Sequence, residues 1–213
     1  MKQTIETIWQ QGFINDDALI APKINDLYNQ KSKNIVDKFE RMFDLNFKAI
    51  IAGMAVVLVV LSFLGMAWLG LYIDVLLLGL VMAGRSAKGK LSLDKSMNSY
   101  DYLKTFDNWL KEQINLYTRL YRYFYPLLFL GIMVQARFSE SMQAIINSWI
   151  IKDPNITLIA GTPIIIIGGV TVLTFIIWLS STALYRWDLD IIYGNQMRKL
   201  DAIIAEMEEL RQP

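Results

Sequence analysis

The sequence has no cysteine and no histidine among its 213 residues, and only 19% of its residues are charged. The missing cysteine excludes disulfide bonds, and the two absences together exclude zinc sites built from cysteine and histidine. They also exclude Ser-His-Asp triads, Cys-His dyads and imidazole acid–base catalysis. The formal net charge is +1, which gives no reason to expect nucleic acid as a partner. An oxygen-only Mg²⁺ or Ca²⁺ site stays compatible with the composition, but the sequence has no convergent array of carboxylates, so we expect no catalytic residue, no metal site and no cofactor.

The sequence instead has long uncharged runs, and 54% of its residues are hydrophobic, which is typical of a membrane protein. The first apolar stretch, 49–84, would be roughly 54 Å long as one helix, whereas the hydrocarbon core is about 30 Å thick. We therefore interpret 48–86 as a hairpin of two transmembrane spans. Trp68, Gly70 and Asp74 indicate the outer turn between them.

Two further spans follow. The uncharged run 123–136 is short, and a span over 120–138 requires Arg122 and Arg137 to snorkel from its two ends. The fourth span is predicted over 156–185, with a kink at Pro163. The segment between them, 139–155, has apolar residues at helical spacing among polar ones and is predicted to be an interfacial helix or loop on the outer surface.

The distribution of lysine and arginine predicts the orientation. Of the 21 basic residues, seven lie in Met1–Lys48, eight in Arg85–Arg122 and four in Arg186–Pro213. Four spans with both termini in the cytoplasm place nearly all of them inside, as the positive-inside rule requires. The predicted fold is therefore an all-α polytopic membrane protein with four transmembrane helices, N-in and C-in.

The segments 1–47, 87–119 and 186–213 are predicted to be cytoplasmic and helical. Apolar residues recur at helical spacing in each, for example at Ile35 and Phe39 and at Leu103 and Phe106. After the fourth span a heptad seam is interrupted by Gln196. Because these stripes can cover one another, we expect the cytoplasmic helical extensions to form a small bundle.

Two patterns resemble chemical sites, and for each we favour a structural interpretation. Gly84–Leu91 reads GRSAKGKL, close to the phosphate-binding loop G-x-x-x-x-G-K-[ST], but Leu91 stands where the hydroxyl residue is needed. Its basic residues are better explained as the cytoplasmic flank of the second span. Asp188 and Asp190 flank Trp187, and we interpret them as part of an interfacial anchor.

The leading hypothesis is a non-enzymatic membrane scaffold or regulator that presents a helical cytoplasmic surface to a soluble partner protein, in a bacterial inner membrane. The alternatives are a homo-oligomeric channel or pore and, third, a membrane enzyme that uses Asp188 and Asp190. The expected partners are membrane lipid, a soluble cytoplasmic protein and further copies of the chain. The candidate partner or oligomer residues are Ile5, Ile8, Trp9, Phe13, Tyr193, Leu200, Ile203, Met207 and Leu210. The candidate pore-lining residues are Thr171 and Thr174, and the candidate membrane-interface anchors are Trp68, Tyr72, Trp149 and Trp187.

Overall fold

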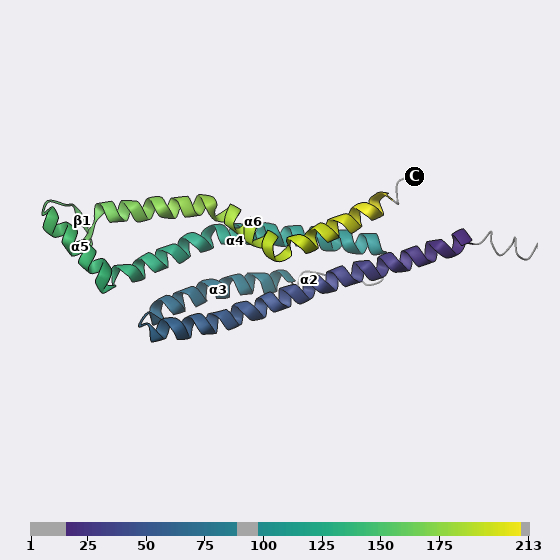
Figure 1. The fold of residues 1–213 in the computed structure, drawn as a ribbon, viewed down its shortest axis with the longest axis horizontal. Helices are drawn as coiled ribbons and strands as arrows, with labels where there is room; N and C mark the ends of the chain where they lie inside the picture. The colour runs from purple at the N-terminus through teal and green to yellow at the C-terminus, as the bar shows by residue number, and fades with distance from the viewer. Residues whose placement is uncertain (1–15, 89–97, 210–213) are drawn as a thin grey trace, which may run out of the picture. The chain divides into compact units, whose positions relative to one another are not determined.

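A computed structural model describes residues 16–88 and 98–209, and these residues are almost entirely helical (Figure 1). The all-α class is therefore confirmed. The helices are α2 (Asp16–Phe63), α3 (Ala67–Lys88), α4 (Ser99–Arg137), α5 (Glu140–Lys152) and α6 (Ile164–Glu209), and two short strands, β1 (Leu158–Ile159) and β2 (Thr162–Pro163), pair antiparallel.

Three of the described helices are long and apolar enough to cross a membrane. These helical stretches are Leu27–Phe63, Ala67–Ser86 and Ile164–Glu209, and each contains an apolar window of 18 residues. The helix α4 is not among them, and its uncharged run 123–136 is shorter than the 17 or so residues that a span usually needs. These helices agree with a membrane protein, whereas the four-span count and the orientation remain predictions.

The turn of the first hairpin lies earlier than the sequence interpretation placed it. The helix α2 ends at Phe63, and Gly65 takes a φ of 74° while its N–H bonds Ser62 O at 3.0 Å. The N–H of Met66 bonds Leu61 O at 2.7 Å, which completes a Schellman cap. The predicted turn residues Trp68, Gly70 and Asp74 instead belong to α3. Gly65 was the correct turn signal, because glycine readily adopts a positive φ.

Gly70 has a packing role in α3. A Cβ atom there would lie 3.3 Å from the backbone Cα of Leu58 on α2. Because glycine has no side chain, α3 can lie close beside α2 at this position.

The predicted interfacial segment is helical, and the fourth span begins later than predicted. Ser139 caps α5 by accepting from Met142 N at 3.3 Å, as N-cap serines do. The residues before α6 form a β-hairpin whose central residues, Ala160 and Gly161, have φ values of 48° and 71°. Pro163 therefore precedes α6 and does not kink a helix, which corrects the predicted start of the span at residue 156.

The helix with an internal proline is α4, at Pro126. Proline lacks a backbone N–H, so Pro126 cannot donate the helical hydrogen bond that other residues of α4 donate. The sequence interpretation did not single out this position.

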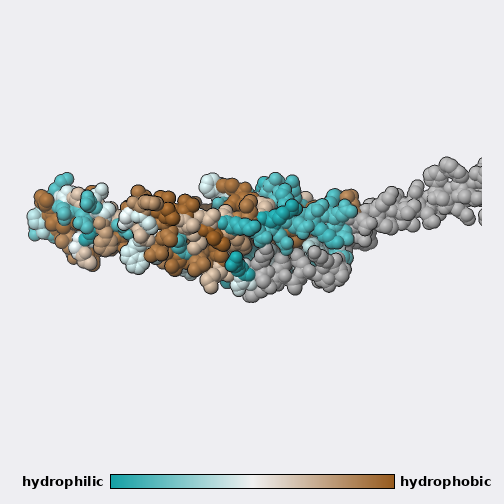
Figure 2. All heavy atoms as spheres, turned by 90° about the horizontal axis from the view of Figure 1, so that it is seen from below, coloured by the Kyte–Doolittle hydropathy of each residue, from teal (hydrophilic) through white to brown (hydrophobic). Residues whose placement is uncertain are grey.

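The chain divides into two compact units. Unit 1 comprises Met1–Phe43, Ser92–Trp109 and Gln196–Pro213, and unit 2 comprises Asp44–Leu91 and Leu110–Asn195. The helices α2, α4 and α6 each contribute residues to both units. The composition of α2 changes along the helix, because charged residues recur up to Lys48 and residues 49–63 are uncharged. Figure 2 shows hydrophobic and hydrophilic residues gathered in separate stretches of the visible face.

Within unit 2, α4 and α6 lie side by side and antiparallel. The rings of Tyr121 and Tyr185 stack with centroids 4.7 Å apart. The guanidinium of Arg122 lies 5.5 Å from the ring centroid of Trp178. Toward the other end of the pair, Arg137 Nε donates to Thr162 Oγ1, just before α6 begins, at 2.8 Å. The pair is therefore in contact at residues 121 and 122 of α4, and the C-terminal end of α4 contacts the β-hairpin that precedes α6.

Candidate interaction unit

Unit 1 has a hydrophobic core to which three helices contribute. The side chains of Val36 and Phe39 on α2, Leu103 and Phe106 on α4, and Leu200 on α6 are almost completely buried. In α2 and α4 these residues recur at spacings of three, which places them on one face of each helix. These residues of the helical stripes predicted from the sequence are therefore buried within unit 1.

Aromatic rings join α2 to α4 in this core. The ring centroids of Phe39 and Phe106 are 5.4 Å apart, and Phe106 lies 5.6 Å from Trp109. Phe43 meets Trp109 edge-on at 5.9 Å. Offset and edge-on pairs are the favourable arrangements for aromatic rings, so they add attraction beyond the burial of apolar surface.

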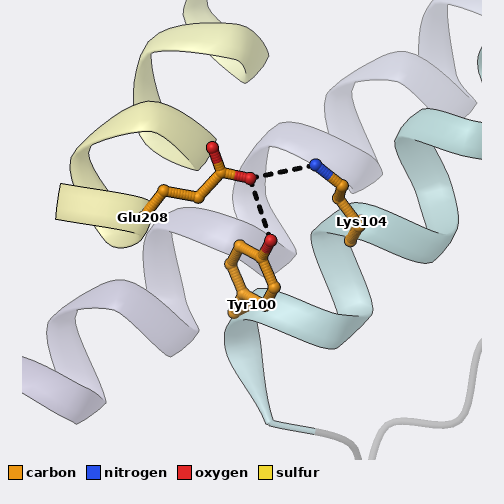
Figure 3. A network of polar contacts seen from close by, with 3 residues as sticks. All are labelled: Tyr100, Lys104 and Glu208. Atoms are coloured by element: carbon orange, nitrogen blue, oxygen red, sulfur yellow. Dashed lines mark hydrogen bonds and ion pairs between the residues drawn. The ribbon is translucent and has the colours of Figure 1, made fainter. Parts of the chain in front are cut away.

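Two glutamates of α6 connect the three helices at the rim of the core. Glu206 accepts a hydrogen bond from the Tyr28 hydroxyl of α2 at 2.6 Å, and Lys31 Nζ lies 3.9 Å from its other oxygen. Glu208 accepts from the Tyr100 hydroxyl and from Lys104 Nζ of α4, each at 2.9 Å (Figure 3). We call the contacts among these six residues the glutamate clasp.

The spacing of the two glutamates explains how one helix reaches two neighbours. Residues two apart on an α-helix are separated by about 200° around its axis, because each residue turns by about 100°. Glu206 and Glu208 therefore point to different sides of α6, one toward α2 and the other toward α4. The clasp fixes both neighbours against the end of α6.

The clasp shifts the ionisation of its members. The hydrogen bond from Lys104, followed by that from Tyr100, lowers the pKa of Glu208 below its ordinary value. The same contact with Glu208 raises the pKa of Lys104. The pKa of Tyr28 is raised, chiefly because its hydroxyl donates to Glu206. All three shifts favour the forms that make these hydrogen bonds near neutral pH: ionised Glu208, protonated Lys104 and the neutral Tyr28 phenol.

The predicted partner residues fall into two groups. Ile5, Ile8, Trp9, Phe13 and Leu210 lie outside the described residues. Tyr193 and Leu200 are buried within the chain, and Ile203 and Met207 are half-buried. Gln196, interpreted as an interruption of the seam, is itself buried. Whether the seam residues also contact a partner stays a prediction.

The candidate pore residues use their hydroxyls within their own helix. Thr171 Oγ1 donates to Ile167 O at 2.8 Å, and Thr174 Oγ1 donates to Val170 O at 2.7 Å. Such back-bonds are common in helices and leave the pore hypothesis untested.

The predicted membrane anchors differ in exposure. Trp68 and Trp187 are strongly exposed, and Trp149 is exposed to a smaller extent. Tyr72 is half-buried, and its hydroxyl donates to Leu127 O of α4 at 2.8 Å. Tyr72 therefore joins two helices, which the anchor interpretation did not anticipate.

The two sequence patterns that resembled chemical sites lie at least partly within helices. Gly84 lies inside α3, buried against Tyr117 and Phe47, so it does not sit in a loop. Asp188 and Asp190 are exposed on α6. Within residues 16–88 and 98–209, no group of three acidic side chains is positioned to hold a metal ion.

The sequence interpretation missed the glutamate clasp. A usable pattern was present, because Tyr28 precedes Lys31 by three residues and Tyr100 precedes Lys104 by four. This spacing places a phenol and an ammonium on one helix face, where both can bind the same carboxylate. The pattern could not, however, show which carboxylate they meet.

The described residues thus form an all-α protein with three helices long enough to cross a membrane and a packed three-helix unit. No family model matches the chain, and no curated protein or solved structure is significantly similar to it.

Proposed function

We propose that the chain is a non-enzymatic scaffold or regulator of a bacterial inner membrane that presents unit 1 to a soluble cytoplasmic protein. The observation that supports this proposal most directly is the glutamate clasp around a closed core. Unit 1 is built from parts of the same helices that carry the long apolar segments. A folded unit that continues directly from membrane helices is suited to present a binding surface at the membrane.

The proposed topology has four spans with both termini in the cytoplasm. Its main support is the antiparallel pairing of α4 with α6. Arg122 and Arg137, which make these contacts, are 15 positions apart in α4, roughly 22 Å of helix. If the apolar part of α6 lies in the bilayer, the adjoining part of α4 must lie there as well. The excess of basic residues in 1–48, 85–122 and 186–213 supports the orientation.

Single cysteines can test this topology cleanly, because the chain has none of its own. Asn147, Asn108 and Glu209 are exposed positions in α5, α4 and α6. A membrane-impermeant maleimide should label N147C in intact cells. It should label N108C and E209C only after permeabilisation. Labelling of E209C but not N147C in intact cells would instead show that only α2, α3 and α6 cross the membrane.

Site-specific photocrosslinking can test the partner. A photoreactive residue at Asp37 or Asn108, both exposed in unit 1, should capture one soluble protein in native membranes. The same residue at Asn147 is the matched control and should not capture it. The crosslink should disappear in F106A, which removes a core ring of unit 1. Capture of the same proteins from all three positions, or of none, would count against the proposal.

The N-terminal segment offers a narrower test. Ile5, Ile8, Trp9 and Phe13 form a small aromatic and apolar face at helical spacing in the sequence. We expect W9A to weaken the crosslink from Asp37 without changing the level of protein in the membrane. An unchanged crosslink would remove this segment from the proposed binding surface.

A homo-oligomeric channel is the second candidate. Gly79, Gly168 and Gly169 lie on apolar helices, and nothing within 4 Å would meet a Cβ atom at any of them. Small residues on open faces of membrane helices allow close helix–helix packing between chains. The mass of the particle in lipid nanodiscs tests this candidate. A strictly monomeric particle would exclude the channel, and a defined multiple would call for ion-flux measurements.

A further inference from the structure

A cavity of about 510 Å³ lies within unit 2, among α4, α5, β2 and the first turns of α6. Its walls are mostly apolar and include Leu130, Met133, Ile146 and Ile167. This volume falls within the range of about 300–1,000 Å³ that is typical of small-molecule sites.

One cation lies at this cavity. Arg137, at the C-terminal end of α4, is among its lining residues and is half-buried. Its Nε donates to Thr162 Oγ1 at 2.8 Å, and its Nη2 donates to Gly161 O at 3.2 Å. These two contacts hold the guanidinium against the β-hairpin.

The charge of Arg137 is not neutralised by these contacts. Both of its acceptors are neutral oxygens, and no carboxylate of the described residues forms an ion pair with it. A guanidinium has five N–H donors, so donors remain for a further acceptor. Phosphate and carboxylate oxygens are the acceptors that match its planar geometry best.

The surroundings of Arg137 favour a lipid as the source of this acceptor. The stretch of α6 that lines the cavity also carries the exposed apolar side chains Ile165 and Val172. This stretch belongs to one of the helices that are able to cross a membrane. Bilayer hydrocarbon is therefore the medium from which a ligand would enter, and a phospholipid combines an acyl chain with an anionic phosphate.

We propose that this cavity binds one phospholipid, with an acyl chain among Leu130, Met133 and Ile167 and with its phosphate paired to Arg137. The apolar walls of the cavity favour the lipid's acyl chain. The guanidinium of Arg137 favours the phosphate and positions the headgroup at the β-hairpin. This inference requires that α6 lies in the bilayer, and it is independent of the proposed soluble partner.

Native mass spectrometry of the full-length protein, extracted in mild detergent and supplied with phosphatidylglycerol, tests the proposal. The wild type should retain one lipid per chain. R137Q should reduce the bound fraction by roughly tenfold, as expected for the loss of a charge-assisted contact. R137K, which keeps the charge, should retain part of the binding. R122Q is the matched control, because Arg122 lies near the other end of the α4–α6 pair, and it should bind like the wild type.

Two further variants separate lipid binding from a structural role of Arg137. T162V removes the hydroxyl that Arg137 bonds but keeps the charge, and it should still bind lipid. I167W fills the cavity and should lose the lipid while Arg137 remains, whereas V172W, on the exposed face of α6, should not. Each variant is first required to elute as a single folded species.

Three outcomes would overturn the proposal. The first is equal lipid retention in the wild type, R137Q and I167W. The second is loss of lipid in the controls R122Q and V172W to the same extent. The third is binding of inorganic phosphate alone in place of the lipid. None of these outcomes bears on the photocrosslinking test of the soluble partner.

Discussion

The hydroxyl of Tyr117 on α4 lies directly against Gly84 on α3, so there is no room for a side chain at residue 84. The ring of Phe47 on α2 closes the same space, with Cζ only 2.8 Å from where a Cβ atom would lie. Gly84 therefore lets three helices of unit 2 approach one another. Its place in the sequence GRSAKGKL follows from helix packing.

Substitution of Gly84 tests this packing. We expect G84A to destabilise unit 2 by about 1–3 kcal/mol, the usual penalty for overpacking. The control is G79A on the same helix, where nothing lies within 4 Å. It should be neutral or slightly stabilising, because alanine favours helix more than glycine does. Thermal unfolding in detergent measures both. The double variant G84A/Y117F should recover part of the loss, and equal midpoints for G84A and G79A would contradict the assignment.

The glutamate clasp predicts a loss of stability in acid. Because its folded pKa is lowered, the Glu208 contact contributes fully above the ordinary glutamate pKa of about 4.3. That contribution is lost as the pH falls through the lowered pKa. Hydrogen exchange of the α6 amides near Glu208 should therefore accelerate in this window, beyond the change in intrinsic rate. In E208Q this acceleration should be smaller, and an identical profile would contradict the role of Glu208.

The raised pKa of Lys104 predicts the complementary behaviour in alkali. A raised folded pKa means that the contribution is present below the ordinary lysine pKa of about 10.4 and is lost as the pH rises through the folded value. K104M should remove this alkaline loss of protection. K111M, at an exposed position on the same helix, is the matched comparison and should still lose protection in alkali.

The aromatic core of unit 1 predicts a large difference between a buried and an exposed substitution. F106A should destabilise unit 1 by about 3–5 kcal/mol, because it leaves a cavity where a fully buried ring was. L27A, at a residue that is 51% exposed, should change stability by about 0.5 kcal/mol or less. Protection of the α4 amides in 99–109 against hydrogen exchange reports both. Similar protection in the two variants would show that Phe106 does not hold unit 1 together.

Asp74 predicts a stabilising substitution. Its Oδ1 atom is buried in α3 and has no hydrogen-bond donor within the described part of the chain. An unsatisfied buried oxygen costs about 1–3 kcal/mol, so D74V should raise the unfolding midpoint. A variant that keeps or gains stability but loses partner capture or oligomerisation would assign the carboxylate a functional role. A lower midpoint would show that Asp74 has a stabilising contact.

Local patterns in the sequence determined the helical class and the positions of most elements. The apolar stripes through Ile35, Phe39, Leu103 and Phe106 are properties of spacing along one helix, and each of these residues is buried as the spacing predicts. The interfacial segment was also predictable as a helix, because Ser139 and the apolar periodicity after it are local. Uncharged runs predicted four spans, and three of the described helices are long and apolar enough to cross a membrane.

Features that depend on backbone geometry were harder to predict. Several glycines could have formed the first turn, and the choice of Gly65 over Gly70 depends on which of them lies close to α2. Pro163 belongs to a hairpin because Ala160 and Gly161 turn the chain just before it. The sequence interpretation instead placed Pro163 inside a helix.

Only the tertiary structure decided which distant residues meet. Glu206 and Glu208 lie more than 100 residues from the side chains that bind them, so no local pattern pairs them with Tyr28 or Lys104. The same holds for Arg137, which the sequence presents as a snorkelling residue and the structure places at an apolar cavity. Periodicity determines the face on which a side chain lies, whereas the packing of helices determines what that face contacts.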